Sequence, residues 1–162
     1  MFEHCCLNIV IHPVKLEEAI KQTKPFKCDY QKAVVNLIYT HNWVTADMKV
    51  FFKKFNITAK QYNILRILRG AQKPVSTLFI RERLLDNGSD VSRIVDRMLA
   101  KGLINKSTCA NDKRLVDLEI TEDGNKLVDQ IQAEPDHLNN IFKNLNAKEI
   151  VQFNKLLNKI RQ

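Results

Sequence analysis

The sequence of 162 residues lacks the features that define several classes of protein. It has only four glycines and four prolines, and it has no long run of alternating apolar and polar residues. Few chain breakers and few alternating runs favour a mainly helical globular protein. No segment approaches the roughly 18 consecutive apolar residues that a membrane span needs, so we expect no membrane partner.

Motifs of enzymes and metal sites are also missing. The sequence contains no GxSxG nucleophile elbow, no glycine-rich phosphate loop and no HExxH motif. The cysteines have no CxxC spacing, which excludes the usual zinc site; they are Cys5, Cys6, Cys28 and Cys109. The histidines are too scattered to predict a site; they are His4, His12, His41 and His137. We therefore expect no catalytic residue, no metal and no cofactor.

The N-terminus does not resemble a signal peptide. Glu3 stands where a basic region belongs, and Asn8 interrupts the first apolar run. Residues 1–13 could lie upstream of the natural start, because a GTG start codon at Val14 would be read as valine. Unpaired thiols fit a reducing compartment. We expect a cytoplasmic protein in which residues 1–27 form an N-terminal arm.

Positive charge is in excess, with a formal net charge of +8 and a sequence pI of about 9.4. Such an excess favours an anionic partner, either a nucleic acid or an acidic membrane surface.

A long helix is predicted from Cys28 to Phe55. Its seam residues recur at alternating steps of three and four; they are Val34, Leu37, His41, Val44, Met48, Phe51 and Phe55. At ~1.5 Å per residue this helix would be ~40 Å long, too long for a small domain to bury on itself. A second subunit would cover it. We thus expect a helical dimerisation region that consists of residues 28–56 and 121–162. Its last helix would be capped by Asn146 and Glu149.

The middle of the chain, residues 57–120, is predicted to be a separate DNA-binding domain. Thr58 and Gln61 form a capping box at the start of one helix, and Gly70 marks its end. Ser76 or Thr77 can then cap a short helix that ends at Leu85.

A third helix follows the turn at residues 87–88, and Ser89 is predicted to cap it. Its apolar residues fall on one face; they are Val91, Ile94, Val95, Met98 and Leu99. Arg93, Arg97 and Lys101 line another face, and Gly102 ends the helix. The cations could contact DNA or form a solvated face, and Arg97 could pair with a neighbouring acid.

In residues 103–120 the apolar residues alternate with polar ones, which predicts a β-hairpin with a polar tip at residues 111–114. Two short helices, a basic helix and this hairpin make a winged helix-turn-helix. A helix fits the major groove, and an arginine on a hairpin tip can enter the minor groove. The expected fold is mainly α, with a two-stranded hairpin wing and terminal helices for dimerisation.

Two segments resemble the MarR family of bacterial regulators, and the resemblance covers residues 28–160. The segment DKRLVDLEIT at residues 112–121 resembles the family's wing signature. Residues 91–98, followed by KGLI at 101–104, resemble its recognition helix and exit turn. The resemblance implies a homodimer with interlocked terminal helices, in which Asp112 orients Arg114 in the minor groove. Alternatively, these two side chains only stabilise the turn.

The resemblance also implies which residues face the major groove. Ser89, Asp90, Ser92 and Arg93 match such positions, although Asp90 is an anion that either accepts from a base, caps the helix or repels DNA. The complete set expected at DNA is Ser76, Thr77, Ser89, Asp90, Ser92, Arg93, Arg97, Lys101, Asp112, Lys113 and Arg114.

Family members commonly bind small effectors between the dimer helices and the DNA-binding lobe. The residues that could line such a pocket are Tyr39, His41, Trp43 and Tyr62, and His41 could instead be a packed, hydrogen-bonded core residue. Cys28 resembles the cysteine of the peroxide-sensing branch, and it could equally be inert.

Together these observations predict a homodimeric repressor that binds a pseudo-palindromic duplex and responds to a small effector. Two alternatives remain open. One is a thiol-based redox sensor acting through Cys28, and the other is a winged-helix module that binds proteins without binding DNA.

Overall fold

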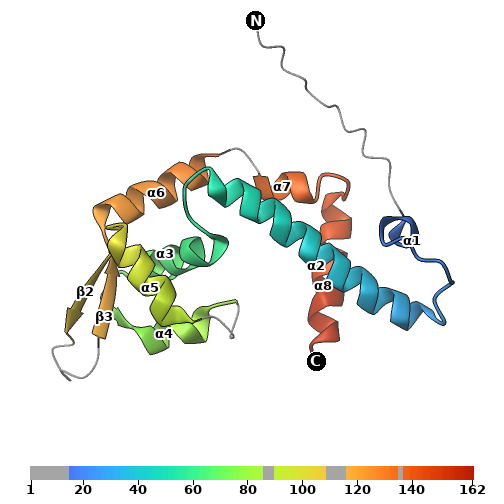
Figure 1. The fold of residues 1–162 in the computed structure, drawn as a ribbon, viewed down its shortest axis with the longest axis horizontal. Helices are drawn as coiled ribbons and strands as arrows, with labels where there is room; N and C mark the ends of the chain where they lie inside the picture. Colours follow the sequence, from blue (N-terminus) through green and yellow to red (C-terminus); the bar gives the residue numbers. More distant parts are fainter. Residues whose placement is uncertain (1–14, 86–89, 109–115, 135–136) are drawn as a thin grey trace, which may run out of the picture. The chain divides into compact units, whose positions relative to one another are not determined.

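The computed structural model describes residues 15–85, 90–108, 116–134 and 137–162. The chain forms two compact units, residues 1–45 and 46–162, and the boundary falls within one long helix. The helices are α1 (Leu16–Ala19), α2 (Asp29–Lys53), α3 (Ala59–Ala71), α4 (Thr77–Arg83), α5 (Val91–Ala100), α6 (Glu122–Ala133), α7 (His137–Ile141) and α8 (Ala147–Ile160) (Figure 1).

The strands form a small antiparallel sheet in the order β1-β3-β2. They are β1 (Val75–Ser76), β2 (Ile104–Thr108) and β3 (Val116–Ile120). The predicted hairpin is confirmed, with Ile104 opposite Ile120 and Thr108 opposite Val116. The third strand, β1, was not predicted, because two residues are too few to show a period of two. It pairs with the central strand through Val75, which lies opposite Leu118.

Helix α3 begins at the capping box predicted from the sequence. The amide N of Gln61 donates to Oγ1 of Thr58 at 3.2 Å, and the amide N of Thr58 donates to Oε1 of Gln61 at 3.0 Å. Gly70 was predicted to lie near the end of this helix, and the helix ends one residue later, at Ala71. Gly70 lies inside the helix, and Gln72 takes the left-handed conformation that ends it, with φ 53°.

Helices α4 and α5 are each capped by a side chain that accepts from the helix's own third backbone amide. Ser76 caps α4, as predicted, and accepts from the amide N of Phe79 at 3.2 Å. The N-cap of α5 is Asp90 and not Ser89, because the Asp90 carboxylate accepts from the amide N of Arg93 at 3.2 Å. Ser89 itself lies outside the described residues.

Gly102 ends α5 as the sequence predicts. Its φ of +67° is the left-handed conformation, and its amide N donates to the carbonyl of Leu99. The amide N of Leu103 donates to the carbonyl of Met98. These two bonds form a Schellman motif, which fixes the direction of the chain as it enters β2.

The core of the second unit surrounds α3, which packs against α4, α5, α6 and β3. Its fully buried side chains come from both helices and strands; they are Ile64, Leu65, Leu68, Ile80, Met98, Ile104, Leu118 and Val128. Helix α6 starts where β3 ends (Figure 1), and Gly124 in its first turn is required there. A Cβ at this position would lie 2.3 Å from the carbonyl oxygen of Leu103.

The first unit contains α1 and most of α2. Lys32 forms an ion pair of 2.6 Å with Glu17, and the hydrogen bond from this ammonium lowers the pKa of Glu17 below its ordinary value. The part of α2 in the first unit leaves most of its large apolar side chains exposed on the single chain; they are Tyr30, Val34, Leu37, Ile38, Tyr39 and Trp43.

Helix α8 has the predicted capping box but no buried residue. Asn146 accepts from the amide N of Glu149 at 3.1 Å, and Glu149 accepts from the amide N of Asn146 at 2.8 Å. The exposed apolar residues of this helix are Val151, Leu156 and Ile160. Among the described residues, every helix is too short or too polar to span a bilayer.

Candidate functional site

The first candidate site is the exposed face of α5. Val91, Val95 and Met98 are buried on one side of the helix, whereas Ser92, Arg93, Asp96 and Arg97 are exposed. An α-helix with this division can pack on a protein core with one face and enter the major groove with the other. The residues predicted for DNA contact on α5, Ser92, Arg93 and Arg97, are therefore accessible.

Asp90 has two local roles at the start of this helix. One carboxylate oxygen caps the helix, and the other lies 3.1 Å from Nε of Arg93. The Arg93 side chain is 81% exposed, so the guanidinium is held near the helix N-terminus and still faces solvent. Three roles were considered for Asp90, and the structure supports helix capping. The ion pair with Arg93 also offsets the negative charge of Asp90, which reduces its repulsion of phosphates.

Arg97 and Lys101 differ from each other. Among the described residues, no acidic side chain lies within ion-pair distance of Arg97. The ammonium of Lys101 instead donates to the backbone carbonyl of Asn56, in the turn between α2 and α3. All three cations of the expected stripe are thus exposed, and the third, Lys101, is also hydrogen-bonded to the backbone of its own chain.

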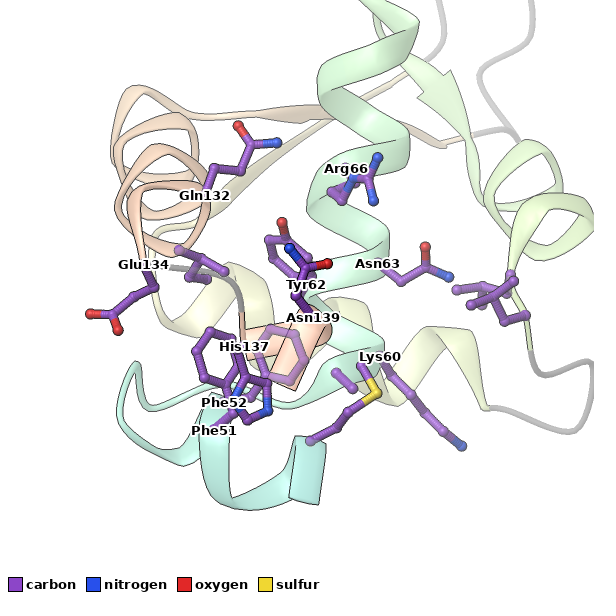
Figure 2. A pocket seen from close by; sticks show the side chains of 15 residues that line it. Phe51, Phe52, Lys60, Tyr62, Asn63, Arg66, Gln132, Glu134, His137 and Asn139 are labelled. Carbon is purple, nitrogen blue, oxygen red and sulfur yellow. The ribbon is translucent and has the colours of Figure 1, made fainter. Parts of the chain in front are cut away.

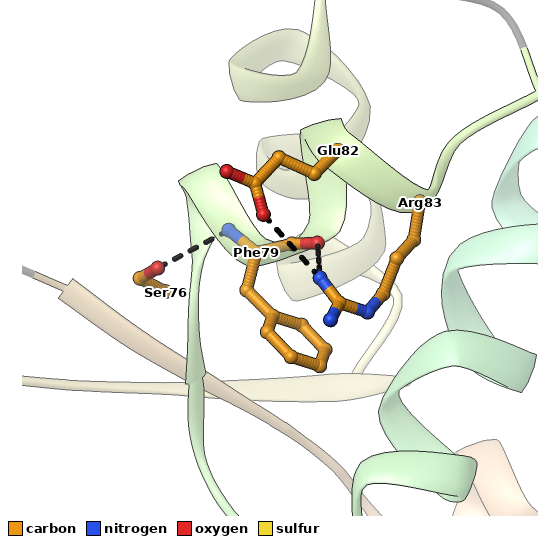
Figure 3. Close-up of polar contacts among 4 residues, drawn as sticks. All are labelled: Ser76, Phe79, Glu82 and Arg83. Carbon is orange, nitrogen blue, oxygen red and sulfur yellow. Dashed lines mark hydrogen bonds and ion pairs between the residues drawn. The ribbon is translucent and has the colours of Figure 1, made fainter.

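On α4, an arginine stacks on an aromatic ring (Figure 3). The guanidinium carbon of Arg83 lies 3.4 Å from the ring centroid of Phe79, and Nη1 donates to the Phe79 carbonyl at 3.1 Å. Nη1 also lies 3.5 Å from a carboxylate oxygen of Glu82. These contacts hold the exposed Arg83 side chain against its own helix.

The wing is joined to the start of α4 through β1. Ser76, the N-cap of α4, lies opposite Asp117 on β3, and Thr77 is the first residue of the helix. This pairing places the start of α4 beside the hairpin. Asp112, Lys113 and Arg114, the residues predicted at the wing tip, lie outside the described residues, as does Cys109.

A second candidate site is a cavity of about 590 Å³ within the second unit (Figure 2). Ligand pockets typically have volumes of ~300–1,000 Å³, so a small molecule fits. Its walls are the end of α2, the start of α3, the residues at the end of α4, the end of α6 and the start of α7. The aromatic and charged residues of the lining include Phe51, Phe52, Tyr62, Arg66, Glu134 and His137.

His137 was not predicted as a site residue, since the other histidines are far away in the sequence. Its ring stacks on Phe51 with centroids 4.1 Å apart and an interplanar angle of 10°. Its Nε2 lies 2.7 Å from a carboxylate oxygen of Asp47. No local pattern shows this contact, because Asp47 and His137 come from helices 90 positions apart in the chain.

The four residues predicted to line an effector pocket do not belong to the same unit. Tyr62 lines the cavity, whereas Tyr39, His41 and Trp43 lie in the first unit and are exposed on the single chain. The seam that contains His41 was predicted to face a partner subunit, so the alternative of a packed His41 stays a prediction. Cys28 is an exposed free thiol directly before α2, and its redox role stays a prediction.

Comparison with known proteins decides the family. The chain is 32% identical to the multiple antibiotic resistance protein MarR of Salmonella typhimurium over 114 residues, which are 68% of this chain and 77% of that protein. The chain belongs to the MarR family. The family model itself matches residues 57–116, from the start of α3 to the start of β3.

Solved structures support the same assignment for this MarR-family chain. An Escherichia coli MarR variant in complex with operator DNA has a TM-score of 0.72 and 25% identity, with coverage of 84% of this chain and 99% of that one. An organohalide-sensing transcriptional regulator in its ligand-free form has a TM-score of 0.75 and 20% identity, with 86% of each chain covered. The fold is therefore the winged helix-turn-helix of MarR-type transcription regulators.

Proposed function

We propose that this MarR-family regulator is a homodimeric repressor that binds a specific double-stranded DNA sequence and is released by a small effector. The observation that carries the proposal is the exposed polar face of α5 beside the base of a hairpin. Membership of a family of regulators, and the operator complex of the Escherichia coli relative, support it.

DNA recognition is assigned to α5 in the major groove. Ser92, Arg93 and Arg97 are exposed along the helix, and Arg93 lies within its first turn. Arginine can donate two hydrogen bonds to guanine, and exposed serine can contact bases or phosphates. Arg114 in the wing is proposed to enter the adjacent minor groove, with Asp112 and Lys113 beside it.

Dimerisation is assigned to the exposed apolar residues of α2 and α8. Exposed side chains such as Leu37, Trp43 and Leu156 are uncovered in the single chain. Fully covering a large apolar side chain stabilises an interface by ~1.5–3 kcal/mol. A second copy of this chain would cover both helices and present two copies of α5 to a pseudo-palindromic duplex, about one DNA turn apart.

Effector binding is assigned to the cavity in Figure 2. Its aromatic wall of Phe51, Phe52 and Tyr62 suits a flat apolar molecule, and Arg66, one helical turn from Tyr62, could pair with an anionic group. Figure 2 shows the Glu134 carboxylate pointing away from the aromatic side chains. A small aromatic acid has this chemistry, and it would regulate only if it binds the DNA-bound and free conformations with different affinity.

The test is selection of bound duplexes from a random pool, followed by titration at several salt concentrations. The proposal predicts one enriched pseudo-palindrome, whose affinity falls steeply with salt as counterions are released. Arg114→Ala should weaken binding about tenfold or more while the chain stays folded and dimeric. Arg114→Lys, which keeps the charge, should retain more affinity. Absence of any enriched duplex would favour a protein-interaction module, and equal affinity of Arg114→Ala and the parent would contradict the wing assignment.

A further inference from the structure

Lys101 makes a contact that the sequence pattern does not show. Its position continues the cationic stripe of Arg93 and Arg97 along α5. In the structure, its ammonium donates to the carbonyl of Asn56, 45 positions earlier in the chain.

The acceptor belongs to a rigid helix end. Asn56 has φ 54°, its amide N donates to the carbonyl of Lys53, and the amide N of Ile57 donates to the carbonyl of Phe52. These bonds make a Schellman motif at the C-terminus of α2, with Phe52 and Ile57 both buried. The C-terminus of a helix carries a partial negative charge, which also favours an ammonium group there.

The donor also belongs to a rigid helix end. Lys101 is the C-cap residue of α5, directly before Gly102 and the Schellman motif that leads into β2. Met98 and Leu103 anchor this motif in the core. The Lys101 side chain therefore joins the ends of two helices whose backbones are each fixed by their own hydrogen bonds.

We infer that Lys101 is a positioning residue, which ties the C-terminus of the recognition helix to the end of α2 and sets how α5 is presented to DNA. This inference rests on the proposed function. The end of α2 and α5 both belong to the second unit. The tether therefore sets the orientation of α5 within that unit, and this orientation determines where each half-site must lie on the duplex.

The experiment uses the duplex selected by the parent protein, together with versions that have one base pair inserted or deleted between the half-sites. One base pair shifts a half-site along the duplex by ~3.4 Å and rotates it by about a tenth of a turn. The parent should prefer the selected spacing by about tenfold. Lys101→Met keeps the length of the side chain and removes the donor, so it should bind all three spacings within about threefold.

The salt dependence distinguishes a tether from a phosphate contact. Lys101→Met should keep the parent slope of log affinity against log salt concentration. Arg97→Met is the matched control on the same helix, and it should lower the slope by about 0.9 while keeping the spacing preference. Lys101→Arg, which keeps a charged donor, should restore the spacing preference and shows that the site tolerates substitution.

Three results would overturn the inference. The first is a fall in slope for Lys101→Met with the spacing preference intact, which is the result for a phosphate contact. The second is an unchanged spacing preference, whether or not overall affinity falls. The third is a parent protein that selects no duplex, which refutes the proposed function and the inference together and is recognised before any variant is made.

Discussion

The winged-helix part of the chain and its outer helices use the same kind of apolar pattern with different outcomes. In the winged helix, residues such as Ile64, Met98 and Leu118 are completely buried within one protomer. On α8, spacing of the same helical kind leaves Leu156 50% exposed and Ile160 69% exposed. Periodicity therefore shows that a face is apolar, and it does not show whether the same chain covers that face.

The two regions differ in whether one chain alone buries their apolar residues. The recognition helix, its cap and the base of the wing are held by contacts within one chain. Large apolar side chains of α8 and of the part of α2 in the first unit remain exposed, which is why a second copy of the chain is proposed to cover them.

Gly124→Ala should have the largest effect, because the added methyl group does not fit within the packed core of the winged helix. The added methyl group would lie 2.3 Å from a backbone oxygen and 2.8 Å from Cγ1 of Ile120. Overpacking of this kind typically reduces the free energy of unfolding by ~1–3 kcal/mol. Chemical denaturation measures the loss.

Gly70→Ala is the matched control for that variant. Gly70 is an exposed helical residue, and no described atom lies within 4 Å of a Cβ built there. Alanine should therefore stabilise α3 by about 0.5–1 kcal/mol. Equal effects of the two substitutions would show that α6 does not pack tightly against the exit turn of α5.

Leu156→Glu tests the other half of the comparison. If a second copy covers α8, the charge replaces an apolar contact worth ~1.5–3 kcal/mol, and the dimer dissociation constant should rise roughly tenfold to a hundredfold. Asn154→Glu places the same charge on an exposed polar position of the helix and should change little. Sedimentation velocity at several concentrations measures both. The assignment of α8 to the dimer interface would be contradicted by a monomeric parent protein, or by a Leu156→Glu variant that associates as tightly as the parent.

Asp90→Asn should have a smaller effect, on DNA affinity. Asparagine is as good an N-cap as aspartate, so the free energy of unfolding should stay nearly constant. The substitution removes the anion that pairs with Arg93 at 3.1 Å, and exposed pairs are worth about 0.2–1 kcal/mol. Binding to the selected duplex should therefore strengthen by up to about fivefold. Weaker binding, limited to duplexes with cytosine at one position, would mean that Asp90 reads a base.

The smallest expected effect is the pH dependence of the α1–α2 contact. The pKa of Glu17 is lowered by the hydrogen bond from Lys32, so the folded state favours the carboxylate. The stabilising contribution is present above the ordinary pKa of glutamate and is lost as the pH falls through the lowered value. Glu17→Gln should remove this dependence without affecting the winged helix. An NMR titration of Glu17 that gives an ordinary pKa would refute the contact.

Much of this fold could be predicted because its signals are local. The capping boxes at Thr58 and Asn146, the cap at Ser76 and the end of α5 at Gly102 each depend on residues a few positions apart. Local reasoning also misplaced the N-cap of α5 by one residue, because both Ser89 and Asp90 are good capping residues.

The rest depends on distant pairs. The bond from Lys101 to Asn56 and the contact of His137 with Asp47 join helices that are far apart in the sequence. Strand β1 forms only because it can pair with the free edge of β3. The effector-pocket residues were predicted from the family resemblance, and three of the four, Tyr39, His41 and Trp43, do not line the cavity of the second unit.

The most direct test of the central claim is a hydroxyl-radical footprint of the parent protein on its selected duplex, with the stoichiometry measured on the same sample. Two protomers per duplex, with two protected windows centred about 10 base pairs apart, are the predicted result. A single protected window, or one protomer per duplex, would contradict a paired winged helix that reads both half-sites.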